Sequence, residues 1–147
     1  MFEVPDQRIV DCCNRVTSEI IGAAIEVHRH LGSGVLESAY EDCLAWELQL
    51  RGISFQRQLF CPIEYKGHRT EHAYRLDLLV EGLIIVELKA EQRIEKIFET
   101  QLNTYLRLNN LYLGLILNFH EERLKDGIRR INNPYAADNL DQIQHLS

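Results

Sequence analysis

The sequence predicts one α/β domain with a mixed central β-sheet of about four strands flanked by helices. Two segments with apolar residues at helical spacing come first, three β-like segments follow, and a third helical segment precedes a last apolar run. A helix between two strands usually carries the chain to a parallel neighbour, so we expect the last strand to join the sheet in parallel. The length of 147 residues fits a single domain over residues 1–147.

The first two predicted elements are helices at residues 10–31 and 35–51. Gly32 and Gly34 separate them, and Gly52 follows the second helix, where a left-handed residue commonly ends a helix. Each helix carries apolar side chains three or four positions apart, which is the spacing of one helix face: Val16, Ile20, Ala24 and Val27 in the first, and Leu36, Tyr40, Leu44 and Leu48 in the second.

The predicted strands cover residues 53–65, 72–80, 83–89 and 112–118. Glu81 and Gly82 lie between the second and third of these, which predicts a hairpin. The third helix is expected at residues 93–108, with an apolar face formed mostly by Ile94, Ile97, Leu102 and Tyr105. Beyond Lys125 the chain is polar, and we expect it to be partly helical and to fray at Leu146 and Ser147.

Charged side chains interrupt two of the predicted strands. Asp77 lies in one of them, while Glu87 and Lys89 follow the apolar run 83–86 in the next. Charge inside such a strand is costly unless it is paired or holds a metal. Two carboxylates offer hard oxygen ligands for a divalent cation, and a lysine offers an ammonium group for water or phosphate. The pattern therefore indicates a metal-dependent phosphodiesterase site.

The hairpin register decides whether these side chains meet. With a plain two-residue turn, Val80 pairs with Leu83, and Asp77 and Glu87 then lie on opposite faces of the sheet. An odd connection, or a bulge with Gly82 in the left-handed region, brings them to one face. That face then holds Arg75, Asp77, Leu79, Ile85, Glu87 and Lys89, and the other is wholly aliphatic, with Leu76, Leu78, Val80, Ile84, Val86 and Leu88. The clean apolar set favours the odd connection.

Composition narrows the function classes. The net charge is −6 with a pI of about 5.5, which counts against indiscriminate binding to nucleic-acid backbones. No run of about eighteen apolar residues is present, so we expect no membrane association, and the N-terminus shows no signal peptide. The four cysteines form no C-x-x-C pair and predict reduced thiols in a cytoplasmic protein.

Several ordered motifs resemble a known family. They are Gly34-Val35-Leu36-Glu37-Ser38-Ala39-Tyr40, Arg75-Leu76-Asp77, Val86-Glu87-Leu88-Lys89-Ala90, Gln101-Leu102-Asn103-Thr104-Tyr105-Leu106 and Asn118-Phe119. The chain resembles the GxxExxY proteins, small members of the PD-(D/E)XK nuclease-like superfamily, over a core of about residues 20–131 that leaves a polar tail at 132–147. The resemblance implies a restriction-endonuclease-like fold. Leu76 stands where the superfamily name has proline.

The resemblance also implies roles for individual residues. Asp77 and Glu87 become ligands of Mg²⁺ or Mn²⁺, with the Leu88 carbonyl and Glu37 as further ligands. Lys89 becomes the catalytic lysine, and Gln101 the helix residue that points at the site. The simpler interpretations are a salt-bridge cluster for the strand residues, a helix-dipole carboxylate for Glu37 and a solvated side chain for Gln101.

Three further residues are expected near the site. Tyr40 is a core residue or supports the ligands from behind. Tyr105 lies one turn after Gln101. Arg75 is expected to pair with a carboxylate rather than contact phosphate. The basic cluster Arg123, Lys125, Arg129 and Arg130 is better explained as a solvated face than as a phosphate site.

Two functions remain open from the sequence. The first is a metal-dependent nuclease acting on DNA or RNA, favoured by the intact set of Asp77, Glu87 and Lys89. The second is a non-catalytic module of the same fold that binds nucleic acid or a protein partner, with a homodimer as one form of it; the acidic net charge favours this function.

Overall fold

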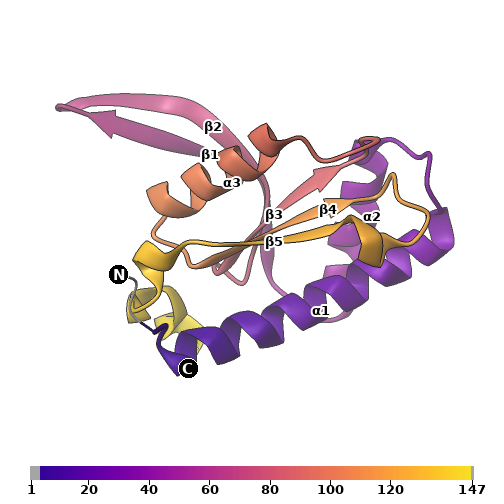
Figure 1. The fold of residues 1–147 in the computed structure, drawn as a ribbon, viewed down its shortest axis with the longest axis horizontal. Coiled ribbons are helices and arrows are strands. Elements are labelled where there is room, and N and C mark those ends of the chain that lie inside the picture. Colours follow the sequence, from indigo (N-terminus) through magenta and orange to yellow (C-terminus); the bar gives the residue numbers. More distant parts are fainter. Residues whose placement is uncertain (1–3, 147) are drawn as a thin grey trace.

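A computed structural model describes residues 4–146. Its sheet has five strands, and helices lie on both sides of it (Figure 1). Residues 1–3, part of the segment in which no signal peptide was expected, and Ser147 lie outside this range. The helices and strands are α1 (Gln7–Leu31), α2 (Glu37–Leu50), β1 (Phe55–Tyr65), β2 (His68–Val80), β3 (Ile84–Lys89), α3 (Lys96–Leu108), β4 (Leu113–Asn118) and β5 (Ile128–Asn132). Three short 3₁₀ segments complete the chain: η1 (Leu124–Gly127), η2 (Pro134–Ala136) and η3 (Leu140–Leu146).

The sheet is mixed, as predicted. Its strand order is β1-β2-β3-β4-β5, and only the β3–β4 pair is parallel, which confirms the crossover through α3. The number of strands is five rather than about four, because residues 128–132 form an edge strand where partial helix was expected. In this strand only Ile128 and Ile131 turn inward, and two apolar residues are too few to predict a strand from sequence.

Helices cover both faces of the sheet. One hydrophobic cluster joins α1 and α2 to Leu78, Val86 and Leu115, and a second joins α3 to Ile85 and Ile116 on the other face. Within α3 the buried residues are Leu102 and Leu106. Ile97, which was expected on the apolar face, is 55% exposed, and Phe98 beside it packs against the core instead.

The C-terminal residues pack against the rest of the domain. The buried Gln142 accepts a hydrogen bond from Tyr112 N at 2.9 Å and donates to the Ala136 carbonyl at 2.8 Å. Leu146, where the chain was expected to fray, is partly buried against the core, and Ser147 lies outside the described residues. No helix within residues 4–146 is both long enough and apolar enough to cross a membrane.

Candidate active site

The β2–β3 connection has the odd length that the sequence favoured. Val80 pairs with Ile84 and Leu78 with Val86, which leaves three residues in the turn. Glu81 and Gly82 both adopt left-handed conformations, at φ 54° and 59°. Asp77 and Glu87 are the next residues beyond the last pair of this ladder, and their side chains line one hollow on the same side of the sheet.

Two contacts hold this turn in place. The Glu81 carboxylate accepts hydrogen bonds from the N–H and the hydroxyl of Ser54, both at 3.0 Å. The Glu81 carbonyl accepts a hydrogen bond from His145 Nε2 at 2.6 Å, so the C-terminal segment packs directly on the turn. A left-handed conformation is unfavourable for a glutamate, and these bonds offset its cost.

One residue departs from the predicted faces. Leu78 and Val80 pack under α1 and α2 as expected, whereas Leu76 packs under α3 with Ile85. The pairing of β2 with β3 ends at Leu78, so β2 bends away from the sheet at Asp77 and the strict alternation fails there. The bend leaves Asp77 at the point where β2 leaves the core.

Asp77 and Glu87 form a closely coupled carboxylate pair. The Asp77 Oδ2 atom accepts a hydrogen bond from Leu88 N at 2.8 Å, and Asp77 N lies 3.4 Å from Glu87 Oε1. Glu87 is only 9% exposed. Burial, and then the like charge of Asp77, raises the pKa of Glu87 to about 8. In the absence of a cation, the site therefore favours the protonated form of Glu87 beside Asp77.

Lys89 brings an ammonium group to this site. It lies two residues after Glu87 on the same face of β3, and its ammonium group lies 4.3 Å from the centre of the Phe98 ring. Within residues 4–146, neither Lys89 nor the two carboxylates belongs to an ion pair shorter than 4 Å. The ammonium group is therefore available to an anionic ligand.

A hollow of about 230 Å³ collects most of the predicted site residues. Its lining comes from β2, β3 and α3 and consists of Arg75, Asp77, Glu87, Lys89, Phe98, Gln101, Leu102 and Tyr105. Gln101 and Tyr105 reach it from one face of α3, as predicted. Tyr105 stacks on Tyr74 with ring centres 4.6 Å apart, and burial together with the charges of Glu87 and Asp77 raises its pKa.

Glu37 lines a second hollow, of about 450 Å³, on the other side of Asp77. Arg75 and Asp77 line both hollows, and Leu88 lines the second. Partial desolvation raises the pKa of Glu37, Lys89 opposes this shift, and Asp77 and other carboxylates add to it. Glu37 remains largely exposed at the start of α2, so these charges act on it through solvent.

Tyr40 and Arg75 were both expected near the site, and the structure gives them different surroundings. Tyr40 is fully buried: its ring stacks on Phe119 at 4.3 Å, and its hydroxyl donates to the Gly32 carbonyl and accepts from Val35 N at 3.3 Å. It is a core residue that fixes the loop before α2. The expected ion pair of Arg75 is not found within the described residues, because its guanidinium lies over Phe60, 5.7 Å from the ring centre.

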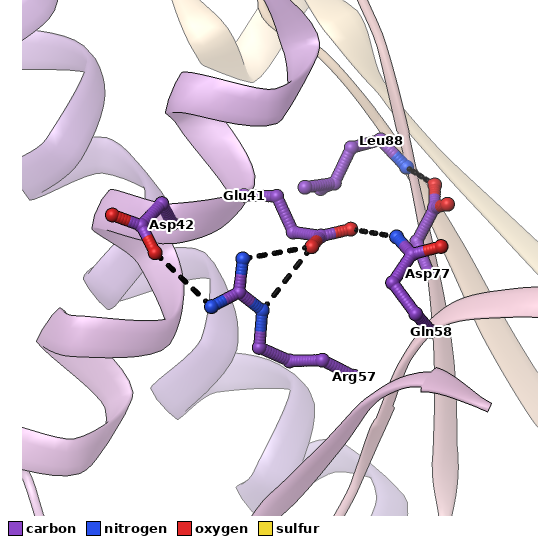
Figure 2. A network of polar contacts seen from close by, with 6 residues as sticks. All are labelled: Glu41, Asp42, Arg57, Gln58, Asp77 and Leu88. Atoms are coloured by element: carbon purple, nitrogen blue, oxygen red, sulfur yellow. Dashed lines mark hydrogen bonds and ion pairs between the residues drawn. The ribbon is translucent and has the colours of Figure 1, made fainter.

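A polar network beside the site escaped the sequence analysis (Figure 2). The buried Glu41 accepts two hydrogen bonds from Arg57, at 3.0 and 3.2 Å, and one from the Gln58 amide. Gln58 has φ 49°, and its side-chain oxygen is buried without a hydrogen-bond partner, while the residue lines the second hollow together with Asp77. Arg57 and Gln58 lie 16 and 17 residues after Glu41, so no helical or strand spacing in the sequence links them.

Asn118 fixes the chain beyond Lys89. Its amide donates to the Glu91 carbonyl at 2.8 Å, and its side-chain oxygen accepts from Glu91 N at 3.0 Å. The adjacent Phe119 N donates to the Lys89 carbonyl at 2.8 Å. These bonds hold the end of β3, and with it the backbone of Lys89, against the end of β4.

The donor set fits a divalent cation with few protein ligands. Asp77 and Glu87 supply two adjacent carboxylates, one of them buried and destabilised by its neighbour. Within residues 4–146 no three acidic, histidine or cysteine side chains come close enough to hold a metal, so Glu37 stands apart from the pair. Mg²⁺ suits such a site because it keeps several water ligands and is commonly bound through one or two carboxylates.

The sheet order, the flanking helices and the carboxylates beside a lysine define a nuclease-like α/β fold. A profile of the PD-(D/E)XK nuclease superfamily matches residues 14–131, and the chain belongs to this superfamily. The structure is similar in fold to a solved one titled "Crystal structure of SSO0001", with a TM-score of 0.51 and 20% identity over 95% of this chain and 71% of that one. A comparison with curated proteins finds no match.

Proposed function

We propose that the protein is a Mg²⁺- or Mn²⁺-dependent phosphodiesterase that cleaves DNA or RNA, and that within its superfamily it belongs with the GxxExxY proteins. The observation that carries the proposal is the convergence of Asp77, Glu87 and Lys89 on one hollow. Superfamily membership supports it, since nucleases of this superfamily typically use divalent metals.

In this proposal each side chain has a distinct task. Asp77, Glu87 and the Leu88 carbonyl would hold the cation, and Glu37 would add its negative charge from the neighbouring hollow. When bound, the cation lowers the pKa of a water molecule and screens the charge of the phosphate. Lys89 positions the attacking water or stabilises the charge that develops on the phosphate, and Gln101 orients the water through its amide.

The supporting residues explain how the ligands stay in place. Leu88 N orients the Asp77 carboxylate, and Asn118 fixes the backbone beyond Lys89. Tyr105 closes one side of the hollow against bulk solvent by stacking on Tyr74. Catalytic groups held by such neighbours lose less free energy to reorganisation when substrate binds.

The test is cleavage of labelled single- and double-stranded DNA and RNA with Mg²⁺ or Mn²⁺. We expect cleavage that EDTA abolishes and that Glu87→Gln reduces by roughly 100-fold or more, since even outer-shell partners of a metal are typically worth 10–100-fold. Glu122→Gln, which removes an exposed carboxylate after β4, is the matched control and should cleave like the unchanged protein.

The alternative is a binding module of the same fold with no catalytic activity. It would be supported if no substrate form were cleaved and if Mn²⁺ bound equally well to the unchanged protein and to Glu87→Gln. Size-exclusion chromatography with light scattering would test whether the protein forms a homodimer.

A further inference from the structure

The β1–β2 hairpin extends beyond the sheet as an arm. β2 pairs with β3 only from Leu78 to Val80, so that residues 59–76 pair only with one another. Figure 1 shows this arm projecting from the body of the domain. A two-stranded hairpin by itself is only marginally stable in water, so an arm that packs on the domain only near its base needs an explanation beyond folding.

The two faces of the arm differ. Cys61 and Tyr74 pair with each other and pack toward α3 in the second hydrophobic cluster. Phe60 and Arg75, the next pair along the ladder, therefore face the opposite way. Phe60 is 50% exposed, which leaves a large aromatic ring on the open face.

The open face joins the candidate active site. Arg75 lies two residues from Asp77, roughly 7 Å along the strand, and lines both hollows. Its guanidinium lies over the Phe60 ring, and His72 contacts the same ring edge-on at 4.7 Å. A ring, a guanidinium and an imidazole thus continue outward from the carboxylates. We call Phe60, His72 and Arg75 the arm patch.

The arm also differs in charge from the rest of the protein. Residues 59–76 contain three basic and two acidic residues, a formal charge of +1, whereas the whole chain carries −6. Both acidic residues are tied to Arg69, at 3.3 Å for Glu64 and 2.8 Å for Glu71. Lys66 and Arg75 have no acidic partner within 4 Å in the described part of the chain. An acidic body with a basic arm confines attraction for a polyanion to the arm.

We propose that the arm patch binds a single strand of nucleic acid and leads it to Asp77 and Glu87. Phe60 stacks on an unpaired base, and Arg75 binds the phosphate next to the one that is cleaved. The ring can stack only on a base whose face is free, which favours a single strand over a duplex. The inference rests on the proposed function, because the strand is the substrate of that site.

The test is fluorescence anisotropy with short labelled oligo-dT and oligo-U, in a Glu87→Gln background that keeps the probes intact. Phe60→Leu should weaken binding by roughly tenfold, since stacking on one base contributes that much, while Phe60→Trp should retain it. Affinity falls as salt is added, and Arg75→Gln should make the slope of log affinity against log salt less steep by about 0.7. This is the contribution of one phosphate contact on a single strand. The two probes show whether the strand is DNA or RNA.

Two control variants match these changes. Trp46→Leu removes another exposed aromatic side chain, on α2, and Arg129→Gln removes an arginine on the opposite edge of the sheet. Neither should change affinity by more than about twofold, a difference small against the expected tenfold loss. Phe60 is half exposed, so its variants should unfold at the same temperature as the parent protein.

The outcomes separate this inference from the proposed function. Equal affinity of Phe60→Leu and its parent, tighter binding of a duplex, or no binding of either probe would overturn the arm proposal. Metal-dependent hydrolysis of bis(p-nitrophenyl) phosphate, which has no base to stack, tests the catalytic site independently. Loss of affinity in Phe60→Leu, with hydrolysis of neither this ester nor any DNA or RNA form by the unchanged protein, would sustain the arm and overturn the nuclease.

Discussion

The backbone N–H of Leu88 donates a hydrogen bond to the Asp77 carboxylate at 2.8 Å, so one strand of the site orients a side chain of the other. The bond depends on the odd β2–β3 connection, since an even turn would carry Asp77 to the opposite face of the sheet. Because β2 bends at this residue, the bond also marks the end of the regular sheet. The geometry of the proposed ligands is therefore set by a turn at the far end of both strands.

The first prediction concerns the stability of the metal-free protein. The pKa of Glu87 is raised from 4.5 to about 8 in the folded state, so folding favours its protonated form. This contribution is complete below pH 4.5 and is lost as the pH rises through about 8. Glu87→Gln should therefore gain stability relative to the unchanged protein over this range, by up to a few kcal/mol.

Urea denaturation in EDTA at both ends of this pH range measures the effect. The exposed-site control Glu122→Gln should follow the unchanged protein at each pH. Parallel pH profiles for Glu87→Gln and the unchanged protein would show that Glu87 is not destabilised by its burial and by Asp77.

The second prediction is that metal binding displaces the proton of Glu87. A cation held by Asp77 and Glu87 needs both carboxylates ionised, so its affinity should rise with pH up to about 8 and level off above. Isothermal titration with Mn²⁺ in two buffers of different ionisation enthalpy measures the protons released. Below about pH 8 close to one proton should be released per ion, and Glu87→Gln should release none.

A pH-independent affinity for Mn²⁺ would contradict this coupling. Asp77→Asn distinguishes the contributions of the two carboxylates. It removes one ligand and also the like charge that helps raise the pKa of Glu87. Its residual binding should therefore be weaker and should level off at a lower pH.

The register of the β2–β3 hairpin could be predicted from the sequence because the alternation of aliphatic residues along these two strands determines it. An odd connection gave one nearly uniform aliphatic face, and the three-residue turn confirms it. The parallel placement of β4 likewise follows from the helix between it and β3. Both arguments rest on the alternation of apolar residues along a strand or on the length of the connection between strands, and both can be read from one sequence.

The parts that escaped prediction depend on tertiary bends. Leu76 leaves its expected face because β2 bends at Asp77, and no residue type announces that bend. Gln58 adopts a positive φ, although the left-handed region more often holds glycine or asparagine. Its contact with Glu41 joins residues far apart in the chain, and periodicity says nothing about such pairs.

The third prediction is that the Glu41–Arg57 pair positions Gln58 rather than binding metal. Glu41→Ala removes the acceptor of both side chains, and because Arg57 is 37% exposed we expect a loss of only about 1–2 kcal/mol in unfolding free energy. Turnover should fall while Mn²⁺ affinity stays within about threefold, since Glu41 is not among the proposed ligands.

A double-mutant cycle with Arg57→Ala measures this coupling. The double variant should be less destabilised than the sum of the two single changes by about 1 kcal/mol, because each single change already breaks the pair. Asp42→Ala is the matched control, since its single bond to Arg57 comes from a carboxylate that is 75% exposed. Strict additivity of Glu41→Ala and Arg57→Ala would remove the basis for a positioning role.

The last prediction concerns the distance of α3 from the sheet. Gly114 lies on β4 beneath this helix, and a Cβ atom added there would lie 2.8 Å from the Leu102 side chain. Leu102 has no free space because it is fully buried, so the helix must shift in Gly114→Ala. We expect a loss of about 1–3 kcal/mol in unfolding free energy, typical of overpacking. Since Gln101 and Tyr105 lie on the same helix, turnover should fall as well.

Leu102→Val provides the compensating change, because it removes a methylene group from the crowded position. The double variant Gly114→Ala with Leu102→Val should recover part of the lost stability and turnover, although Leu102→Val alone should be destabilising by about 1 kcal/mol. Leu106→Val, one turn further along α3 and equally buried, is the matched control and should not rescue Gly114→Ala. If both valine variants had equal effects, the added Cβ would not be accommodated at Leu102 specifically. The distance of α3 from the sheet would then not determine the position of Gln101.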